Sequence, residues 1–257
     1  MTIKIAFFGQ KPIAEFVFAD LLSEIDGGAP FEISFVCTNV FPTGWWNTAN
    51  LSDRATERGI HVLDNTAGDQ TLVEEYLMAS RPDLLLSIQH PQILSNSAIN
   101  NVNGNAFNLH LAPLPRFRGW NGASHAIVEQ FNRFGVTLHT MTNRVDLGLI
   151  VDAEEFAITD DATAWSLYQD SAKAGVLVMA RFFDGIASNG LSSISGVPMV
   201  GESRYYKRDA LDSLRDVSGL AFPDLQRVWR ATYFPPHPPA FFHTPNGPVE
   251  LILKERS

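Results

Sequence analysis

Residues 83–88 read Asp-Leu-Leu-Leu-Ser-Ile, a short and almost continuous run of apolar side chains. A strand that is apolar on both faces is typical of a parallel sheet with helices on both sides, because a sheet with one face in water alternates apolar and polar residues. Ile3–Phe8 has the same character and ends at Gly9, and Glu32–Thr38 is rich in residues that favour strands. Together these runs predict the buried strands of one parallel sheet.

Segments in which apolar residues recur at helical spacing separate the predicted strands. The segments predicted as helices are Pro12–Leu22, Ser52–Arg58, Thr71–Ala79, Ser124–Phe131 and Thr163–Ile186. Further strands are predicted at Ile60–Leu63, Ala106–Leu109, Val136–Met141 and Leu149–Ile158. Because strands and helices alternate along the chain, we expect an α/β fold with a doubly wound, Rossmann-like and mostly parallel sheet.

The composition changes near residue 190. Several prolines within 235–239 end any helix that precedes them, and Ala240–Leu253 is predicted as a hairpin that turns at Asn246-Gly247. We therefore expect an α/β domain over residues 1–190, which would hold the functional site. Residues 191–257 would form a small C-terminal extension with a helix and a β-hairpin.

The 257-residue chain is acidic and contains one cysteine. Its formal net charge of −9 disfavours nucleic acid as a partner, because nucleic-acid binding usually starts from a basic surface. The single cysteine, Cys37, excludes an internal disulfide and any cysteine-rich zinc site. The N-terminal segment lacks the features of a secretory signal, and no run approaches the roughly 20 apolar residues of a membrane span. We expect a cytoplasmic protein.

The sequence signatures of several other α/β enzymes are missing. Gly9-Gln10-Lys11-Pro12, which follows the first predicted strand, matches neither the dinucleotide-binding nor the P-loop pattern. The Gly-x-Ser-x-Gly sequence of serine hydrolases does not occur. The seven histidines show no tight metal-ligand spacing, so no metal is expected.

The segment Asn105–His125 carries the polar residues best placed for chemistry. Asn108 and His110 come at the end of a predicted strand, and alternation along a strand places both side chains on the same face. Ligands of open α/β sheets bind at this carboxyl edge of the strands. The following segment, Leu114–Gly119, is predicted to be a rigid loop, because prolines fix its backbone and Gly119 permits a tight turn.

Asp146 follows the strand predicted at Val136–Met141 and lies in a turn from which its carboxylate can reach His110. Such a pair fixes the tautomer of the imidazole and suits it to general-base work. Asn108 would donate an N–H to the oxyanion of an acyl transfer, and an attacking amine needs no enzyme nucleophile. An Asn-x-His sequence at a strand end is by itself more often structural, and His139 is expected to be a packed residue of its strand.

Three blocks of the sequence resemble the formyltransferases that use N10-formyltetrahydrofolate: Asn108-Leu109-His110, Leu-Pro-Arg-Phe-Arg-Gly at 114–119, and Gly-Val-Thr-Leu-His-Thr-Met with a later Asp-Leu-Gly within 135–148. The resemblance covers about residues 1–190, which would be the catalytic domain. It implies that Asn108, His110 and Asp146 are catalytic. An amine would attack the formyl carbon while Asn108 and His110 stabilise the oxyanion, and Asp146 would orient His110 and balance its charge.

The resemblance also implies that the folate co-substrate binds against the loop after the strand at 83–88. Backbone groups of this loop would recognise the edge of the pterin, while Ile93 and Leu94 pack on its face. The residues expected to bind the co-substrate are Ser87, Ile88, Gln89, His90, Pro91, Ile93, Leu94 and Asp146.

Members of this family formylate Met-tRNA, glycinamide ribonucleotide or amino sugars, and the C-terminal segment resembles that of the sugar N-formyltransferases. Those enzymes typically act on nucleotide-linked amino-deoxy sugars for surface polysaccharides such as the O-antigen of lipopolysaccharide. A short tail and a net charge of −9 disfavour tRNA as the substrate. The residues expected to contact the sugar substrate are Arg118, Trp120 and Asn121.

Other functions stay open at this point. The same chemistry could act on another amine, Met-tRNA included. Water in place of the amine would give a formyltetrahydrofolate hydrolase, and a folate- or nucleotide-sugar-binding module would keep the fold without turnover. Phe241 and Phe242 would suit either a homodimer contact or packing of the hairpin on its own domain. The tail is not acidic, and some of its basic residues could serve an anionic substrate: Arg204, Lys207, Arg208, Arg227 and Arg230.

Overall fold

The computed structural model describes residues 2–40 and 51–252, and its centre is a sheet of eight strands in the order β3-β2-β1-β4-β5-β7-β8-β9. The strands are β1 (Ile3–Gly9), β2 (Phe31–Thr38), β3 (Val62–Asp64), β4 (Leu84–Ile88), β5 (Ala106–His110), β7 (Arg133–Thr140), β8 (Leu149–Ala157) and β9 (Val197–Pro198). The strands from β3 to β5 are parallel, and β7, β8 and β9 pair antiparallel with their neighbours. The doubly wound, mostly parallel sheet expected from the sequence is confirmed.

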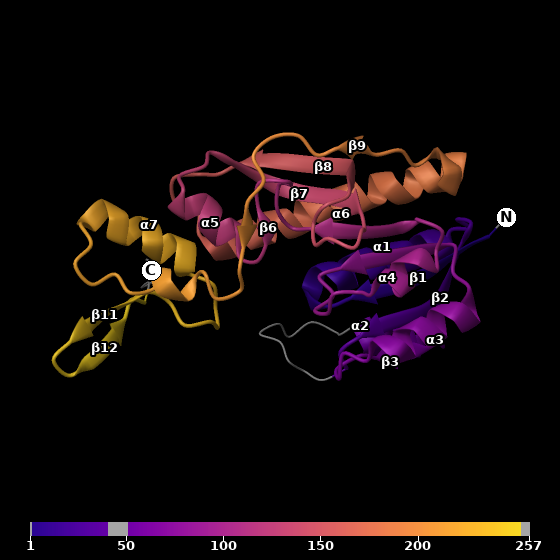
Figure 1. The fold of residues 1–257 in the computed structure, drawn as a ribbon, viewed down its shortest axis with the longest axis horizontal. Coiled ribbons are helices and arrows are strands. Elements are labelled where there is room, and N and C mark those ends of the chain that lie inside the picture. Colours follow the sequence, from indigo (N-terminus) through magenta and orange to yellow (C-terminus); the bar gives the residue numbers. More distant parts are fainter. Residues whose placement is uncertain (1, 41–50, 253–257) are drawn as a thin grey trace.

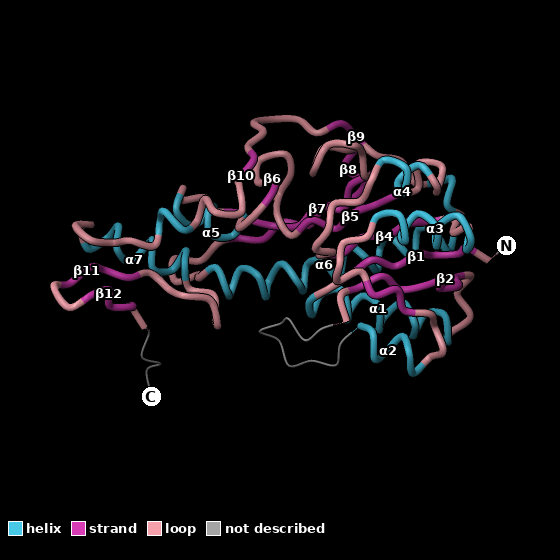
Figure 2. Tube along the Cα trace, turned by 60° about the horizontal axis from the view of Figure 1, so that its bottom comes forward, coloured by secondary structure: helices cyan, strands magenta, loops and turns pink. Residues whose placement is uncertain are grey.

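Helices cover both faces of this sheet (Figures 1 and 2). They are α1 (Lys11–Asp26), α2 (Leu51–Glu57), α3 (Gln70–Ser80), α4 (Asn96–Asn100), α5 (Gly122–Val128) and α6 (Ala164–Asn189). The apolar sides of α1, α2 and α6 share one buried cluster, while α3 and α4 share a second cluster with the opposite face of the sheet. Helix α4 is too short to leave a periodic pattern, and the sequence analysis did not predict it.

Strand β4 explains why residues 83–88 determine the architecture. All of its residues are buried, and their side chains alternate between the two clusters. Leu84 and Leu86 pack on the side of α1 and α6, whereas Leu85 packs on the side of α3 and α4. Fully burying a leucine contributes about 2 kcal/mol to stability, so a strand covered on both faces favours apolar residues at successive positions.

The last part of the chain packs at the end of the molecule away from β1 and β2 (Figure 1). It contains α7 (Phe222–Thr232), the hairpin of β11 (Phe241–Thr244) and β12 (Gly247–Glu250), and the short 3₁₀ helix η2 (Asp212–Leu214). A further 3₁₀ helix, η1 (Leu191–Ser193), directly follows α6, and its Leu191 packs on the cluster that α1, α2 and α6 share. Ala231 of α7 joins the cluster that buries Ala126 and Ile127 of α5. The division into parts at residue 190 stays a prediction.

The turn of the hairpin lies one residue earlier than expected. Thr244 pairs with Gly247, so the turn residues are Pro245 and Asn246 rather than Asn246 and Gly247. Proline presets the backbone angle that a first turn position requires, which favours this placement.

Among the described residues, no helix is long and apolar enough to cross a membrane.

A second difference from the sequence analysis is a two-stranded ribbon outside the main sheet. Strand β6 (Arg118–Gly119) pairs in parallel with β10 (Tyr205–Tyr206), as Figure 2 shows. The sequence gives no local signal for so short a pair, because each strand depends on a partner more than 80 positions away along the chain. The ribbon ties the segment that follows α6 to the loop that precedes α5.

Candidate active site

A pocket of about 310 Å³ lies where β4 and β5 end at their carboxyl edge. Its wall combines the loop after β4, the end of β5, the turn between β7 and β8, and the ribbon of β6 and β10. The residues that line it are Lys11, Ser87, Gln89, His90, Pro91, Gln92, Ile93, Leu94, Ile99, Asn108, Leu109, His110, Gly119, Trp120, His139, Met141, Thr142, Asn143, Arg144, Val145, Asp146 and Tyr205.

His110 has an oxygen acceptor near each of its ring nitrogens. Its Nε2 lies 2.7 Å from the carbonyl oxygen of Phe117, and its Nδ1 lies 3.6 Å from Oδ1 of Asp146. The carbonyl oxygen of Phe117 can only accept, so this hydrogen bond places an N–H on Nε2 of His110. The other ring nitrogen faces the carboxylate of Asp146 beside the pocket.

Asp146 is held in place by the turn in which it lies. Its side chain is only 10% exposed, and Oδ2 accepts the backbone N–H of Gly119 at 2.8 Å. Within the same turn, the hydroxyl of Thr142 donates to the carbonyl oxygen of Leu147 at 2.6 Å. Asp146 adopts a left-handed backbone with φ of 52°, which aspartate tolerates better than most residues. The predicted reach of Asp146 toward His110 is thus present in the structure.

The loop at 114–119 is fixed by the ribbon. Gly119 has a φ of 86°, and a Cβ atom at this position would lie 2.3 Å from the carbonyl oxygen of Tyr206. The N–H groups of Arg118 and Trp120 donate to the carbonyl oxygens of Arg204 and Tyr206, each at 3.0 Å. The turn itself lies at residues 114–117, and Gly119 lies in β6. Its left-handed backbone and the close approach of the tail are two reasons for glycine at this position.

His139 takes part in the site, which the sequence analysis did not predict. It is buried, as expected of a packed residue, but its Nε2 lies 3.1 Å from Nδ2 of Asn108. Burial lowers the pKa of His139 to about 4, so the ring is neutral near pH 7. The signal that reveals the contact is the antiparallel register of β5 and β7, which places Asn108 directly opposite His139.

The loop after β4 forms the wall opposite these side chains. Of the residues predicted to bind the co-substrate, Ile88 does not line the pocket: it is buried, and its carbonyl oxygen accepts the N–H of Gln10 at 3.2 Å. Ile93 is 73% exposed, which leaves its side chain free to pack on a ligand. Burial lowers the pKa of His90 to about 4, so this lining residue is also neutral.

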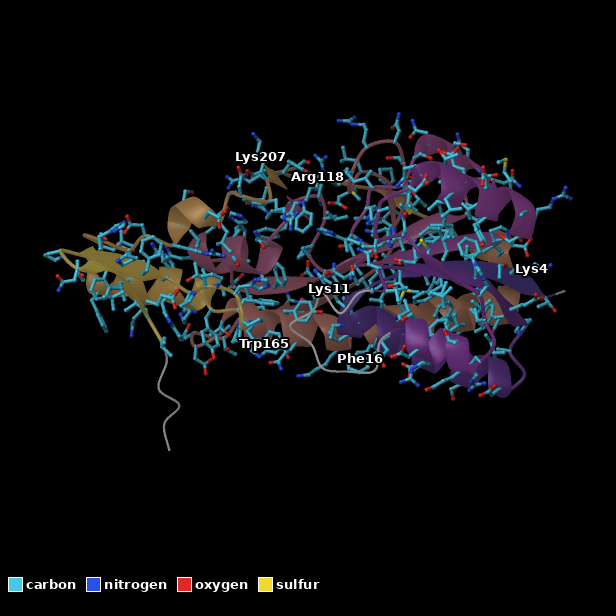
Figure 3. The ribbon with its side chains drawn as sticks, turned by 90° about the horizontal axis from the view of Figure 1, so that it is seen from below. Lys4, Lys11, Phe16, Arg118, Trp165 and Lys207 are labelled. Atoms are coloured by element: carbon cyan, nitrogen blue, oxygen red, sulfur yellow. The ribbon has the colours of Figure 1, made fainter. Side chains whose placement is uncertain are left out.

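Lys11 is a second lining residue that the sequence analysis did not single out as functional. Its Nζ donates to Oε1 of Gln89 at 3.1 Å, and Figure 3 labels it near the middle of the molecule. Burial, assisted by the positive charge of Arg208, lowers its pKa to about 8. The sequence feature that could have identified Lys11 is its position just after the carboxyl end of β1, because ligands of open α/β sheets bind at that edge.

The residues predicted to contact the sugar lie in different places. Trp120 lines the pocket and carries the guanidinium of Arg208 over its ring at 5.0 Å. Asn121 lies outside the lining and donates to the carbonyl oxygen of Arg208 at 3.3 Å. The guanidinium of Arg118 is also outside the lining, and it holds the carbonyl oxygen of Val145 through contacts of 2.9 and 3.2 Å. Arg118 thus braces the turn that carries Asp146.

Several of the basic residues of the tail are engaged with the protein itself. Arg204 pairs with Glu129 and Glu202, Arg227 pairs with Asp224, and Arg230 donates to the carbonyl oxygen of Ala162. Arg208 is the one placed beside the pocket, through Trp120. Lys207 follows the ribbon and lies near Arg118 in Figure 3.

Across residues 2–40 and 51–252, no cluster of His, Cys, Asp or Glu could hold a metal ion.

Residues 50–182, just over half of the chain, match the family described as formyl transferase. The chain belongs to this family. Similar curated proteins include the bifunctional polymyxin resistance protein ArnA of Wigglesworthia glossinidia brevipalpis, 29% identical over 142 residues, and the GDP-perosamine N-formyltransferase of Brucella melitensis, 25% identical over 164 residues. These matches cover 55% and 62% of this formyl transferase chain, but only 22% and 60% of the relatives' own lengths.

Solved structures share the fold over almost the whole chain. A 4-N formyltransferase from Francisella tularensis superposes with a TM-score of 0.78 at 18% identity, covering 99% of both chains. An N-formyltransferase from Helicobacter canadensis, solved with folinic acid and dTDP-3-aminofucose, superposes with a TM-score of 0.72 at 20% identity, covering 91% of this chain and 81% of that one. At these identities the likeness establishes the formyl transferase fold.

Proposed function

We propose that this formyl transferase moves a formyl group from N10-formyltetrahydrofolate to the amine of a nucleotide-linked amino-deoxy sugar. The observation that carries the proposal is the meeting of Asn108, His110 and Asp146 at one pocket, opposite the loop after β4. Membership of the formyl transferase family supports the reaction. The relative named as a GDP-perosamine N-formyltransferase and the neighbour solved with dTDP-3-aminofucose support the sugar as acceptor.

The geometry supports a direct attack by the amine on the formyl carbon. As the new C–N bond forms, the formyl oxygen becomes an oxyanion. Asn108 offers an amide N–H to this oxygen, and together with the imidazole of His110 it stabilises the tetrahedral state. Asp146 orients His110 from 3.6 Å. Collapse of the intermediate breaks the bond to N10 of the folate, and a proton passes from the attacking amine to the leaving nitrogen.

The folate co-substrate is proposed to lie against the loop after β4. This loop supplies lining residues with backbone polar groups, and the exposed side chain of Ile93 offers an apolar face. Two neighbours support the assignment: the Helicobacter canadensis enzyme holds folinic acid, and the sugar 3N-formyl transferase WlaRD was solved with 5-N-formyl-THF. Gln89 of this loop and Lys11 at the start of α1, which are joined by a hydrogen bond, are placed to add polar contacts.

The acceptor is proposed to enter beside Trp120 and Arg208. An aromatic ring with a guanidinium over it suits a planar base or a sugar linked to a phosphate. Met-tRNA is the alternative acceptor, but a chain with a net charge of −9 would repel a polyanion at long range. A small anionic nucleotide sugar needs only the local positive charge of Lys11 and Arg208.

The experiment is an incubation with N10-formyltetrahydrofolate and a panel of nucleotide-linked 3- and 4-amino-deoxy sugars, with release of tetrahydrofolate as the readout. Release that depends on an amino sugar is the expected result. Release without any amine would identify a hydrolase, and release only with charged initiator tRNA would identify that substrate instead. Folate binding without release in any mixture would identify a binding module.

Two further properties stay predictions. A cytoplasmic location is tested by fractionation of cells that produce the chain. A homodimer is tested by light scattering. Phe222 of α7 and Val249 of β12 are exposed and could form a contact between two copies, whereas Phe242 packs into the small cluster of the tail.

A further inference from the structure

Asn108 stabilises an oxyanion only when its amide nitrogen, and not its amide oxygen, faces the reacting carbonyl. The two orientations of an asparagine amide occupy nearly the same space, so hydrogen bonds must select between them. Nδ2 of Asn108 lies 3.1 Å from Nε2 of His139. The effect of this contact depends on which nitrogen of His139 carries a proton.

The surroundings of His139 place its proton on Nδ1. This nitrogen lies 2.9 Å from the carbonyl oxygen of Thr140, which can only accept a hydrogen bond. Burial, assisted by the nearby charge of His110, lowers the pKa of His139 to about 4. A neutral ring carries one N–H, so Nε2 is left with a lone pair. That lone pair can accept an N–H from Asn108, and it would repel the amide oxygen.

Asp146 is the other polar group near Nε2 of His139. Its Oδ1 lies 3.8 Å from Nε2, beyond hydrogen-bond distance, and closer to Nδ1 of His110 at 3.6 Å. Its Oδ2 is occupied by the N–H of Gly119. Asn108 is therefore the hydrogen-bond partner of Nε2. The contact is part of the sheet itself, because β5 and β7 lie side by side (Figure 2) and their register puts Asn108 opposite His139.

We infer that His139 is a positioning residue, which accepts one N–H of the Asn108 amide and so leaves the second N–H for the formyl oxygen. The role of the second N–H in catalysis rests on the proposed function, whereas the hydrogen bond to His139 does not. Without an acceptor at this place, the amide can turn and present its oxygen to the developing negative charge. His139 touches neither substrate in this scheme and acts through Asn108 alone.

The first test reads the tautomer directly and needs no activity. Nitrogen NMR of the wild-type chain with labelled histidine, near pH 7, should show His139 neutral with a protonated Nδ1 and an unprotonated Nε2. The Asn108→Ala variant should shift the Nε2 resonance of His139, because the donor is lost. A protonated Nε2, or a resonance that does not respond to Asn108→Ala, would overturn the inference whether or not the chain transfers formyl groups.

The second test uses kinetics with the amino sugar that the panel identifies. His139→Leu removes the acceptor and should lower kcat at least ~10-fold, with KM for both substrates changed less than about threefold, since the loss of a whole oxyanion donor costs roughly 100-fold or more. His139→Gln supplies an amide oxygen near the place of Nε2 and should recover most of the loss.

A double-mutant cycle separates positioning from a general structural effect. In the Asn108→Ala background, His139→Leu should change kcat less than about twofold, because no amide is left to orient. Independent, multiplicative losses would contradict the inference. If His139→Leu fails to fold, the positioning role of His139 is tested by the NMR measurement and by His139→Gln. That variant is then compared with wild-type His139 in the presence of Asn108 and in the Asn108→Ala background. Wild-type inactivity on every amine would refute the proposed function and leave the NMR result standing by itself.

Discussion

At the scale of single residues, the proposed chemistry depends on polar side chains that are held in fixed orientations at the pocket. Asn108 and Asp146 are both fixed by hydrogen bonds, and His110 lies between two acceptors. His139 is neutral near pH 7 because burial lowers its pKa. Asp146 lies closer to Nδ1 of His110, at 3.6 Å, than to Nε2 of His139, at 3.8 Å.

We predict that His110→Ala and Asp146→Ala each lower kcat by at least ~100-fold, the usual scale for acid–base and oxyanion groups. The matched control is His61→Ala, because His61 is exposed and stacks on Tyr76 away from the pocket. It should keep near-wild-type turnover. Wild-type turnover by either site variant, at unchanged folding, would refute the assignment of these residues.

Alternation in a strand was sufficient to place Asn108 and His110 on one face, and the resemblance to the formyltransferases joined Asp146 to them. Neither was sufficient for His139. That contact depends on the register of an antiparallel pairing, and the sequence predicted the strand without predicting its direction. Lys11 was missed for a related reason. Its hydrogen bond to Gln89 and the effect of Arg208 on its pKa exist only in the folded protein, because both partners are distant along the chain.

At the scale of elements, the ribbon of β6 and β10 links the tail to the site. Its strands hold Gly119, whose N–H binds Asp146, and Arg118, which braces the turn around Asp146. Tyr206 of β10 is in turn held by Glu129 through a hydrogen bond of 2.7 Å. The apolar runs predicted the strands of the large sheet that are stabilised by burial, such as β1, β4 and β5. A two-residue strand has no such pattern, so the ribbon could not be predicted.

Gly119→Ala tests this link. The new Cβ would meet the carbonyl oxygen of Tyr206, and the left-handed backbone would be strained as well, so we expect a loss of stability on the order of 2–3 kcal/mol. Turnover should fall at least ~10-fold, because the N–H that binds Asp146 is displaced. Thermal unfolding and kcat measure the two effects.

Gly59→Ala is the matched control for this variant. Gly59 has a similar φ of 69°, but no atom lies within 4 Å of the place of its Cβ. It should cost about 1 kcal/mol from backbone strain and leave kcat unchanged. Equal effects of the two substitutions on kcat would show that the ribbon does not position Asp146.

At the scale of the whole molecule, the pocket lies between the parallel half of the sheet and the antiparallel half, and Tyr205 of the tail contributes to its lining. Building it buries titratable groups, among them His90 and His139. Burial disfavours their charged forms, and this makes the stability of the folded chain depend on pH.

We predict that the free energy of unfolding decreases as the pH falls from about 6.5 to about 4. The pKa of His90 falls from its ordinary value of 6.5 to about 4 on folding, so in this range the unfolded chain binds a proton that the folded chain does not. The loss is complete below about pH 4. His90→Leu should remove its share of the decrease, on the order of 3 kcal/mol at most, in denaturant titrations at a series of pH values.

The exposed His61 supplies the control, and His61→Leu should keep the wild-type pH dependence. A His90→Leu chain that lost stability with acid as steeply as wild type would show that this side chain is not buried in its neutral form.

The most direct measurement follows an isotopically labelled formyl group from N10-formyltetrahydrofolate into product. The account predicts that the label appears on the amine nitrogen of a nucleotide-linked amino-deoxy sugar, identified by mass spectrometry, and that tetrahydrofolate is released in equal amount. The His110→Ala variant should suppress both products together. Label recovered as free formate, or on Met-tRNA and not on any sugar, would contradict the account.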